Sequence, residues 1–377
     1  MKNSSLIKIL NLLKVKGLGP QRVRTIISHF GIEAEIFSLS SEELCAAPNI
    51  NLKIARAIHS YSDLDFGEKE LERANKVGAS IVAFWDKDYP TLLKKIYDPP
   101  VILYVKGNSL KKEDDCVGVV GTRNITPYGK KVTTSIVSDL VSSDLTIVSG
   151  LARGVDSFAH HTAVKAGGKT IAVLGNGIDF VYPSENKKLA ESICENGSVI
   201  SEFSIGTNPD AGNFPQRNRI ISGLSHGTIV VEAGNRSGAI LTALNAVDQN
   251  REVFAVPGRL IDKMSVGCNR LIRNGAIPVE SSEQILDHIT NQLFNPRNPV
   301  QQKMKLHLSK EEHALVDLLE DDPKHIDDIV LISDLEITQA LTLLLKLELK
   351  GGAEMEPMGG SVGGLSFCGV RMRALFM

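Results

Sequence analysis

The stretch VGVVGTR at residues 117–123 is a short apolar run that ends at a glycine and carries an arginine into the residues that follow. The same arrangement recurs in TIVSGLAR at 146–153 and in TIVVEAGNR at 228–236. Short, continuously apolar runs separated by helical patterns are typical of parallel strands covered by helices on both faces. Between 116 and about 290 these runs are CVGVVG, TIVSG, TIAVLG, SVISEF, TIVVEA, EVFAVPG and AIPVE. The sequence therefore predicts a doubly wound, mostly parallel α/β sheet.

Three arginines, Arg123, Arg153 and Arg236, stand where a predicted strand passes into a predicted helix. Helix N-termini bear partial positive charge and favour acidic side chains, so arginines there indicate that an external anion supplies the negative charge. Backbone N–H groups at a helix start bind anions, and an arginine adds bidentate phosphate recognition. Ligands of such sheets sit outside the carboxyl ends of the strands, where these arginines lie. A polyanion-binding face is expected.

Further polar residues add to this face. Arg217, Asn218 and Arg219 occur in GNFPQRNRIIS at 212–222, and together with the other arginines they favour phosphate binding over a solvated helix start. Ser237 and Gly238 open a predicted helix and offer hydroxyl and amide donors, although an ordinary N-cap explains them as well.

Two aromatic residues, Phe214 and Tyr128, are candidates for stacking on bases, with core packing as the alternative. The stretch GNGIDF at 175–180 has Phe180 where a dinucleotide-binding loop has its third glycine, and this argues against NAD even with Glu202 available for a ribose. Asp156 and His160 lie four residues apart without further ligands at metal spacing. No cofactor and no metal are expected.

Composition limits the class of protein. The chain has 377 residues, 42% hydrophobic and 23% charged, which predicts two or three globular domains. Its net charge of −2 means that nucleic-acid binding must use a local patch. The five scattered cysteines are typical of free thiols in a reducing cytosol, and no apolar run is long enough for a membrane span.

The chain ends differ from its centre. Around Gly17-Leu18-Gly19-Pro20, residues 10–29 show apolar positions at helical spacing, which indicates a helix-hairpin-helix flanked by Lys16 and Arg22, or a small helical bundle. The predicted organisation is a helical domain at 1–75, an extended Rossmann-like domain at 76–290, a linker at 291–305, a winged-helix-like domain at 306–351 and a disordered tail at 352–377.

The winged-helix-like domain is predicted from three helical patterns within 308–350. The third helix offers no positive charge before Lys346, and the second carries Asp327 and Asp328. These charges favour protein docking or a structural role over reading a DNA groove.

Several long motifs occur together and in order, and with them the chain resembles the bacterial DNA-processing protein DprA (Smf) family. They are GTR at 121–123, SGLARGVDSFAH at 149–160, LGNGIDFVYPSEN at 174–186, FPQRNRIISGLS at 214–225, VVEAGNRSGAILTA at 230–243 and REVFAVPGR at 251–259. The resemblance spans about 80 to 285 and implies an extended Rossmann domain, often with a small helical domain before it and a winged-helix-like one after it.

The resemblance also implies a function. Members bind single-stranded DNA in natural transformation without acting as enzymes, form homodimers, protect incoming strands and help to load the recombinase RecA, all in the cytoplasm. The family's phosphate pocket maps onto Arg123, Ser149, Gly150, Arg217, Asn218, Arg219, Ser237 and Gly238. Arg153 and Arg236 join this set on the physical grounds given above. The tail departs from the family, whose members continue with a short basic wing.

The alternative is an enzyme similar to the Rossmann-like hydrolases that cleave nucleoside monophosphates. Those enzymes carry a P-G-G-x-G-T loop near a catalytic glutamate. The corresponding region here keeps Gly227-Thr228 and Glu232 but lacks the preceding Pro-Gly-Gly. Binding is therefore favoured over catalysis, with Glu232 as the residue that separates the two.

Overall fold

The structure, a computed structural model, describes residues 1–110, 115–294, 315, 324–333, 335–349, 353–357 and 370–374. The chain divides into two compact units, Met1–Pro296 and Arg297–Met377. Among the described helices, none has both the length and the apolar character that crossing a bilayer requires.

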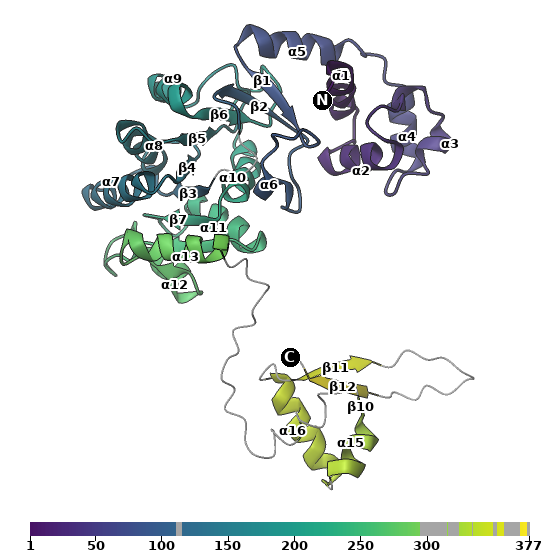
Figure 1. The fold of residues 1–377 in the computed structure, drawn as a ribbon, viewed down its shortest axis with the longest axis vertical. Helices are drawn as coiled ribbons and strands as arrows, with labels where there is room; N and C mark the ends of the chain where they lie inside the picture. Colours follow the sequence, from purple (N-terminus) through teal and green to yellow (C-terminus); the bar gives the residue numbers. More distant parts are fainter. Residues whose placement is uncertain are drawn as a thin grey trace. The chain divides into compact units, whose positions relative to one another are not determined.

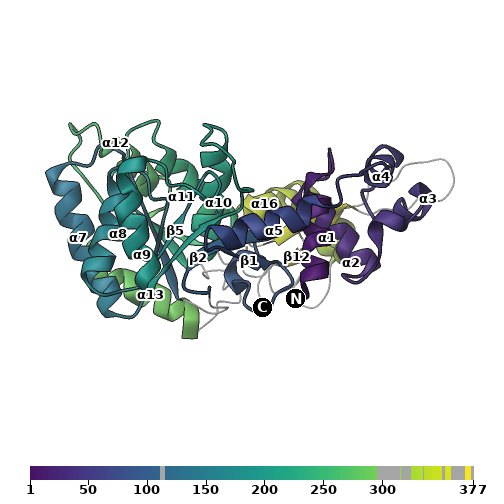
Figure 2. The ribbon, with the colours of Figure 1, turned by 90° about the horizontal axis from the view of Figure 1, so that it is seen from above.

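The first unit begins with a helical domain that lies beyond the β1–β2 edge of a large sheet (Figures 1 and 2). Its helices are α1 (Asn3–Lys14), α2 (Pro20–Phe30), η1 (Ile36–Ser38), α3 (Ser41–Leu44), α4 (Leu52–His59) and α5 (Phe66–Lys76). Gly17 adopts a φ of 85° in the turn between α1 and α2, a conformation that favours glycine. Arg22 donates from Nη1 to the carbonyl of Gly17 at 2.9 Å, so it braces the hairpin turn.

The sheet that follows has nine strands in the order β1-β2-β6-β5-β4-β3-β7-β8-β9. Their bounds are β1 (Ser80–Ala83), β2 (Ile102–Gly107), β3 (Cys116–Val120), β4 (Thr146–Ser149), β5 (Thr170–Val173), β6 (Ser198–Ser201), β7 (Gly227–Val230), β8 (Glu252–Ala255) and β9 (Ile277–Pro278). The strands from β6 to β9 in this order are parallel, and β1 and β2 extend the β6 edge in antiparallel fashion.

Helices cover both faces of this sheet (Figure 1). They are α6 (Thr91–Lys94), α7 (Pro127–Ser142), α8 (Val155–Lys165), η2 (Ser184–Asn186), α9 (Lys187–Asn196), α10 (Asn213–Leu224), α11 (Gly238–Asp248), α12 (Val266–Arg273) and α13 (Ser282–Phe294). Apolar side chains of α7, α8 and α13 pack on one face, and those of α6, α10, α11 and α12 pack on the other. The predicted doubly wound, mostly parallel α/β fold is confirmed.

The second unit contains α15 (Ile326–Ser333), α16 (Ile337–Leu349) and a small antiparallel sheet. The sheet is formed by β10 (Lys324–His325), β12 (Val370–Ala374) and β11 (Ala353–Pro357), in that order. Of the three helices expected here, the first falls almost entirely outside the described residues. Of the predicted linker, 291–294 form the last turn of α13, and 295–305 lie outside the described residues.

The prediction of a disordered tail is wrong for β11 and β12. In their antiparallel register Glu354 lies opposite Arg373 and Glu356 opposite Arg371. Opposite charges at directly facing positions stabilise a strand pair. The alternating patterns Glu-Met-Glu and Arg-Met-Arg are typical of strands, but the many glycines around them led to the prediction of disorder. The other tail residues lie outside the described part of the chain.

Candidate nucleic-acid interface

The candidate site lies where the direction of strand addition reverses. Strands β3 and β7 are adjacent and parallel, with Val120 opposite Val230, but the chain proceeds from β3 toward β6 and from β7 toward β9. Such a switch point leaves a crevice outside the carboxyl ends of the strands. Here a cleft of about 840 Å³ opens, and its lining includes the segments that follow β3 and β7 and one side of α10.

Arg217 carries a charge from α10 into the wall of this cleft. Its side chain is only 4% exposed, and Nη1 donates to the carbonyls of Gly150 (2.6 Å) and Val173. Burial lowers its pKa to about 10, while nearby Asp156 acts in the opposite direction. Its Nε is buried without a hydrogen-bond partner. A buried guanidinium with an unused donor beside a cleft is suited to bind an anion.

Gly150 makes this arrangement possible. A Cβ on Gly150 would lie 2.5 Å from Nη1 of Arg217, so only glycine lets the guanidinium reach the strand ends. The amide of Gly150 donates to Oδ2 of Asp156 at 3.1 Å. Burial raises the pKa of Asp156, and Arg217 and backbone donors oppose that effect. Asp156 and Gly150 thus fix the turn after β4 against which Arg217 rests.

Arg123 shares an aromatic ring with Arg217 at the mouth of the cleft. The guanidinium carbon of Arg123 lies 5.8 Å from the centroid of the Phe214 ring, and that of Arg217 lies 6.0 Å from it. Tyr182, which is half exposed, places its ring 6.0 Å from that of Phe214 with a tilt of 37°. An exposed arginine beside two aromatic rings has the chemical groups suited to phosphates and to stacked bases.

The start of α11 forms the opposite rim. Ser237 is the N-cap residue, and its hydroxyl accepts from the amide of Ala239 at 3.4 Å. Arg236 is exposed on this rim, and Asn218 of α10 donates to the carbonyl of Gly238 at 3.4 Å. The free amides of a helix N-terminus attract anions, so this rim adds to the positive potential of the cleft.

The predicted site residues are divided between the cleft and other places. Arg123, Arg217, Asn218, Arg236, Ser237 and Gly238 line the cleft. Ser149 does not line it, because its hydroxyl is buried and donates to the carbonyl of Val119 at 2.6 Å. Gly150 acts through Arg217. Arg153 pairs with Glu185 through two bonds of 2.8 Å on the surface.

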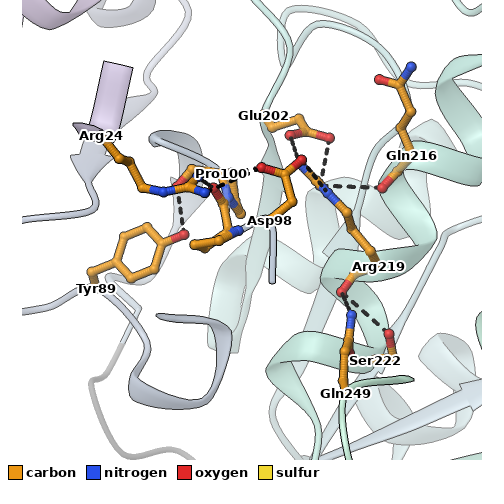
Figure 3. Close-up of polar contacts among 10 residues, drawn as sticks. Arg24, Tyr89, Asp98, Pro100, Glu202, Gln216, Arg219, Ser222 and Gln249 are labelled. Atoms are coloured by element: carbon orange, nitrogen blue, oxygen red, sulfur yellow. Dashed lines mark hydrogen bonds and ion pairs between the residues drawn. The ribbon is translucent and has the colours of Figure 1, made fainter. Parts of the chain in front are cut away.

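Arg219 does not line the cleft and instead points toward Glu202 and Asp98 (Figure 3). Its guanidinium binds Glu202 at 2.7 and 3.0 Å and lies 3.7 Å from Asp98. Asp98 is also 3.5 Å from Arg24 of α2, whose Nη1 donates to the carbonyl of Pro99. Glu202, considered above for a ribose, is thus occupied by Arg219. This side of α10 is a structural junction between the helical domain and the sheet.

The candidate metal residues serve other purposes. Nδ1 of His160 lies 2.6 Å from the hydroxyl of Thr170, and burial lowers the pKa of His160 to about 3. In the part of the chain that the structure describes, no group of three or more histidine, cysteine, aspartate or glutamate side chains is placed to hold a metal ion.

Tyr182 and Asp156 line the cleft, and the sequence did not predict a binding role for Tyr182 or a supporting role for Asp156.

Comparison with known proteins identifies the family of this chain. The family model of DNA recombination-mediator protein A matches residues 80–290. The chain belongs to this family, known as DprA or Smf. Two further family models match its ends, a SAM-like helix-hairpin-helix tandem at 9–60 and a DprA winged helix domain at 301–358. The predicted family is confirmed.

Similar proteins come from several bacteria. Protein Smf of Escherichia coli K12 is 38% identical over 298 residues, covering 77% of this chain and 78% of that protein. DNA processing protein DprA of Bacillus subtilis is 43% identical over 213 residues, covering 56% and 72%. The structure of DprA from Streptococcus pneumoniae matches with a TM-score of 0.66 at 35% identity, covering 76% of this chain and 98% of that one. DprA from Helicobacter pylori, described with a unique single-stranded DNA binding mode, matches with a TM-score of 0.51 at 31% identity, covering 57% and 96%.

Proposed function

We propose that this protein binds single-stranded DNA in the cleft at the β3–β7 switch point and acts without catalysis. The observation that carries the proposal is buried Arg217, which lines the cleft together with Arg123 and Arg236 and whose Nε has no hydrogen-bond partner. A phosphate of the strand would complete the hydrogen bonding of Arg217. Membership of a DNA-processing family supports the choice of DNA as the anion.

Binding in this cleft would depend on the backbone more than on sequence. Phosphates would lie over the start of α11 and between Arg123 and Arg217, while bases stack on Tyr182 and Phe214. Release of counterions makes such binding steeply salt-dependent. The single-stranded DNA binding described for the H. pylori relative supports a single strand over a duplex.

A hydrolase function is less well supported by this geometry. Glu232, its candidate catalytic residue, is only 4% exposed and does not line the cleft. Its two carboxylate oxygens accept from the amide (2.9 Å) and the hydroxyl of Thr126 at the start of α7. A carboxylate that is bound by the N-cap residue of a helix and lies outside the anion cleft is poorly placed to act on a nucleotide held there.

We further propose that this protein has the other roles that its resemblance to the family implies. The protein acts in natural transformation in the cytoplasm, protects incoming single strands as a homodimer and helps to load RecA onto them. A dimer would bring two clefts to one strand, which raises affinity through effective concentration.

The test is fluorescence anisotropy with a labelled oligothymidylate and an equal-length duplex, measured over a range of salt concentrations. Arg123→Ala should weaken single-strand binding about tenfold and lower the salt slope by about 0.7, the value for one phosphate contact. Arg273→Ala, which removes an exposed arginine of α12 outside the cleft lining, is the matched control. Wild-type protein that is folded but binds neither nucleic acid would overturn the proposal.

A further inference from the structure

A second chamber of about 840 Å³ adjoins the cleft on the far side of Met264, which lines both. Its remaining lining comes from the start of α7, from Glu232 after β7 and from the loop after β8, and comprises Thr126, Pro127, Tyr128, Glu232, Pro257, Gly258, Arg259, Ile261, Asp262, Lys263 and Ser265. The hydroxyl of Thr122, a cleft residue, lies 3.3 Å from the sulfur of Met264. Thr122 and Met264 thus connect the linings of the two cavities, and a strand bound in the cleft would have the chamber beside it.

The chamber walls are held in place by hydrogen bonds. The amide of Ala233 donates to the carbonyl of Met264 at 2.7 Å, which ties the loop to the segment after β7. Asn269 of α12 holds both backbone groups of Gly258, at 2.9 and 3.2 Å. A Cβ on Gly258 would lie 2.0 Å from the hydroxyl of Ser265, so the loop closes this tightly only with glycine there. The chamber is thus preformed, which lowers the entropic cost of binding.

The charges of the chamber differ from those of the cleft. Three arginines and one carboxylate line the cleft, whereas the chamber is lined by two cationic residues, Arg259 and Lys263, and by two carboxylates, those of Glu232 and Asp262. With no excess positive charge, the chamber is a poor site for a phosphate. Pro127, Tyr128, Pro257, Ile261 and Met264 give it apolar walls suited to a flat, weakly polar group.

Tyr128 offers that group a fixed aromatic surface. Its ring is half exposed, and its hydroxyl donates to the carbonyl of Pro257 at 3.0 Å, which restrains the ring against the loop. Burial raises the pKa of Tyr128, and the nearby charge of Glu232 raises it further, so the phenol stays neutral at physiological pH. Each carboxylate oxygen of Glu232 accepts one hydrogen bond from Thr126 and keeps a further lone pair that can accept another.

We propose that this chamber is a nucleobase subsite: a base of the strand bound in the cleft stacks on Tyr128 and presents its polar edge to Glu232. This inference rests on the proposed single-stranded DNA binding. Since a carboxylate accepts hydrogen bonds, the chamber favours a base with an exocyclic amino group. Cytosine presents such an amino group where thymine presents a carbonyl oxygen, so the subsite distinguishes two bases of nearly equal size.

The first test is Tyr128→Ala, with Tyr97→Ala as the matched loss of an exposed tyrosine outside both cavities. Loss of one stacked base should weaken binding of an oligothymidylate about tenfold. The salt slope should stay at the wild-type value, because stacking releases no counterions. Tyr128→Phe keeps the ring and should recover most of the affinity.

These readouts separate the subsite from the function on which it rests. If the wild type binds and Arg123→Ala lowers the salt slope, but Tyr128→Ala binds like the wild type, the subsite is wrong and the cleft proposal stands. A lower salt slope for Tyr128→Ala would also overturn the subsite, because the chamber would then hold phosphate. If the wild type binds no single strand, both proposals fail.

A second test addresses the base. Placing 2-aminopurine in the strand reports stacking directly, since its fluorescence should fall on binding to the wild type and fall less with Tyr128→Ala. Replacing the thymines of the oligonucleotide by cytosine should tighten wild-type binding about fivefold, and Glu232→Gln should remove the difference. Equal affinity for the two oligonucleotides would contradict the assignment of Glu232.

Discussion

A single buried arginine links the structural and binding roles of the cleft. Arg217 is held by two backbone carbonyls, that of Gly150 directly after β4 and that of Val173 at the end of the parallel strand β5. Strand ends thus fix the guanidinium before any ligand arrives. A preorganised charge binds its partner with little loss of side-chain entropy. The residue that confers this preorganisation is Gly150, which contacts no ligand itself.

Gly150→Ala tests this dependence. The added Cβ would displace the guanidinium of Arg217, so we expect single-strand affinity to fall about tenfold and the free energy of unfolding to fall by about 1–3 kcal/mol. Gly19→Ala is the control, because a Cβ there meets open space. Anisotropy titration and denaturant unfolding measure the two effects, and wild-type affinity in the Gly150→Ala variant would refute the role of Gly150.

At the scale of the element, α10 serves two purposes on opposite sides. Successive helical residues are rotated by about 100°, so Arg217 and Arg219, two residues apart, point in nearly opposite directions. Arg217 therefore faces the cleft, and Arg219 faces Glu202 and Asp98 (Figure 3). The proposed binding surface and the junction with the helical domain are two faces of one helix.

Arg219→Ala should destabilise the fold and spare DNA binding. Arg219 and Glu202 are only 16% and 11% exposed, so removing the arginine leaves a nearly buried carboxylate without its partner. We expect a loss of about 3 kcal/mol in the free energy of unfolding, with single-strand affinity within about twofold of wild type. Arg153→Ala removes the matching surface pair, which is 63% and 54% exposed, and should change stability little. Similar losses in both variants would contradict the expectation.

Local sequence patterns were enough to predict the strands and helices. The features that they did not predict depend on contacts between residues far apart in the chain. The buried strands are continuous apolar runs, and Arg123 and Arg236 follow such runs directly, so both were visible. The partner of Arg153 is Glu185, 32 residues away in η2, and no spacing rule links them. Which of Arg217 and Arg219 faces the ligand depends on the rotation of α10 against the sheet, which periodicity alone does not specify.

At the scale of the molecule, acid should weaken the fold through His160. Its pKa is about 3 in the folded protein and 6.5 in the unfolded chain, so only the unfolded chain gains this proton as pH falls below 6.5. Between pH 6.5 and pH 5 this costs about 2 kcal/mol. His160→Gln should reduce the loss of stability over that range by this amount, measured by denaturant unfolding at both pH values. An unchanged pH dependence would contradict the burial of a neutral His160.

The carboxylate of Asp98 couples the helical domain to the sheet domain. Arg24 of α2 and Arg219 of α10 both approach it, at 3.5 and 3.7 Å. A shortened chain that begins after α5 would leave Asp98 to Arg219 alone and would uncover the segment on which α2 rests. The electrostatic field around Arg219 in α10 would then change, and Arg219 is the residue next to Asn218, which lines the cleft. The stability of the sheet domain and the electrostatics of its cleft therefore depend on the helical domain that packs beside it.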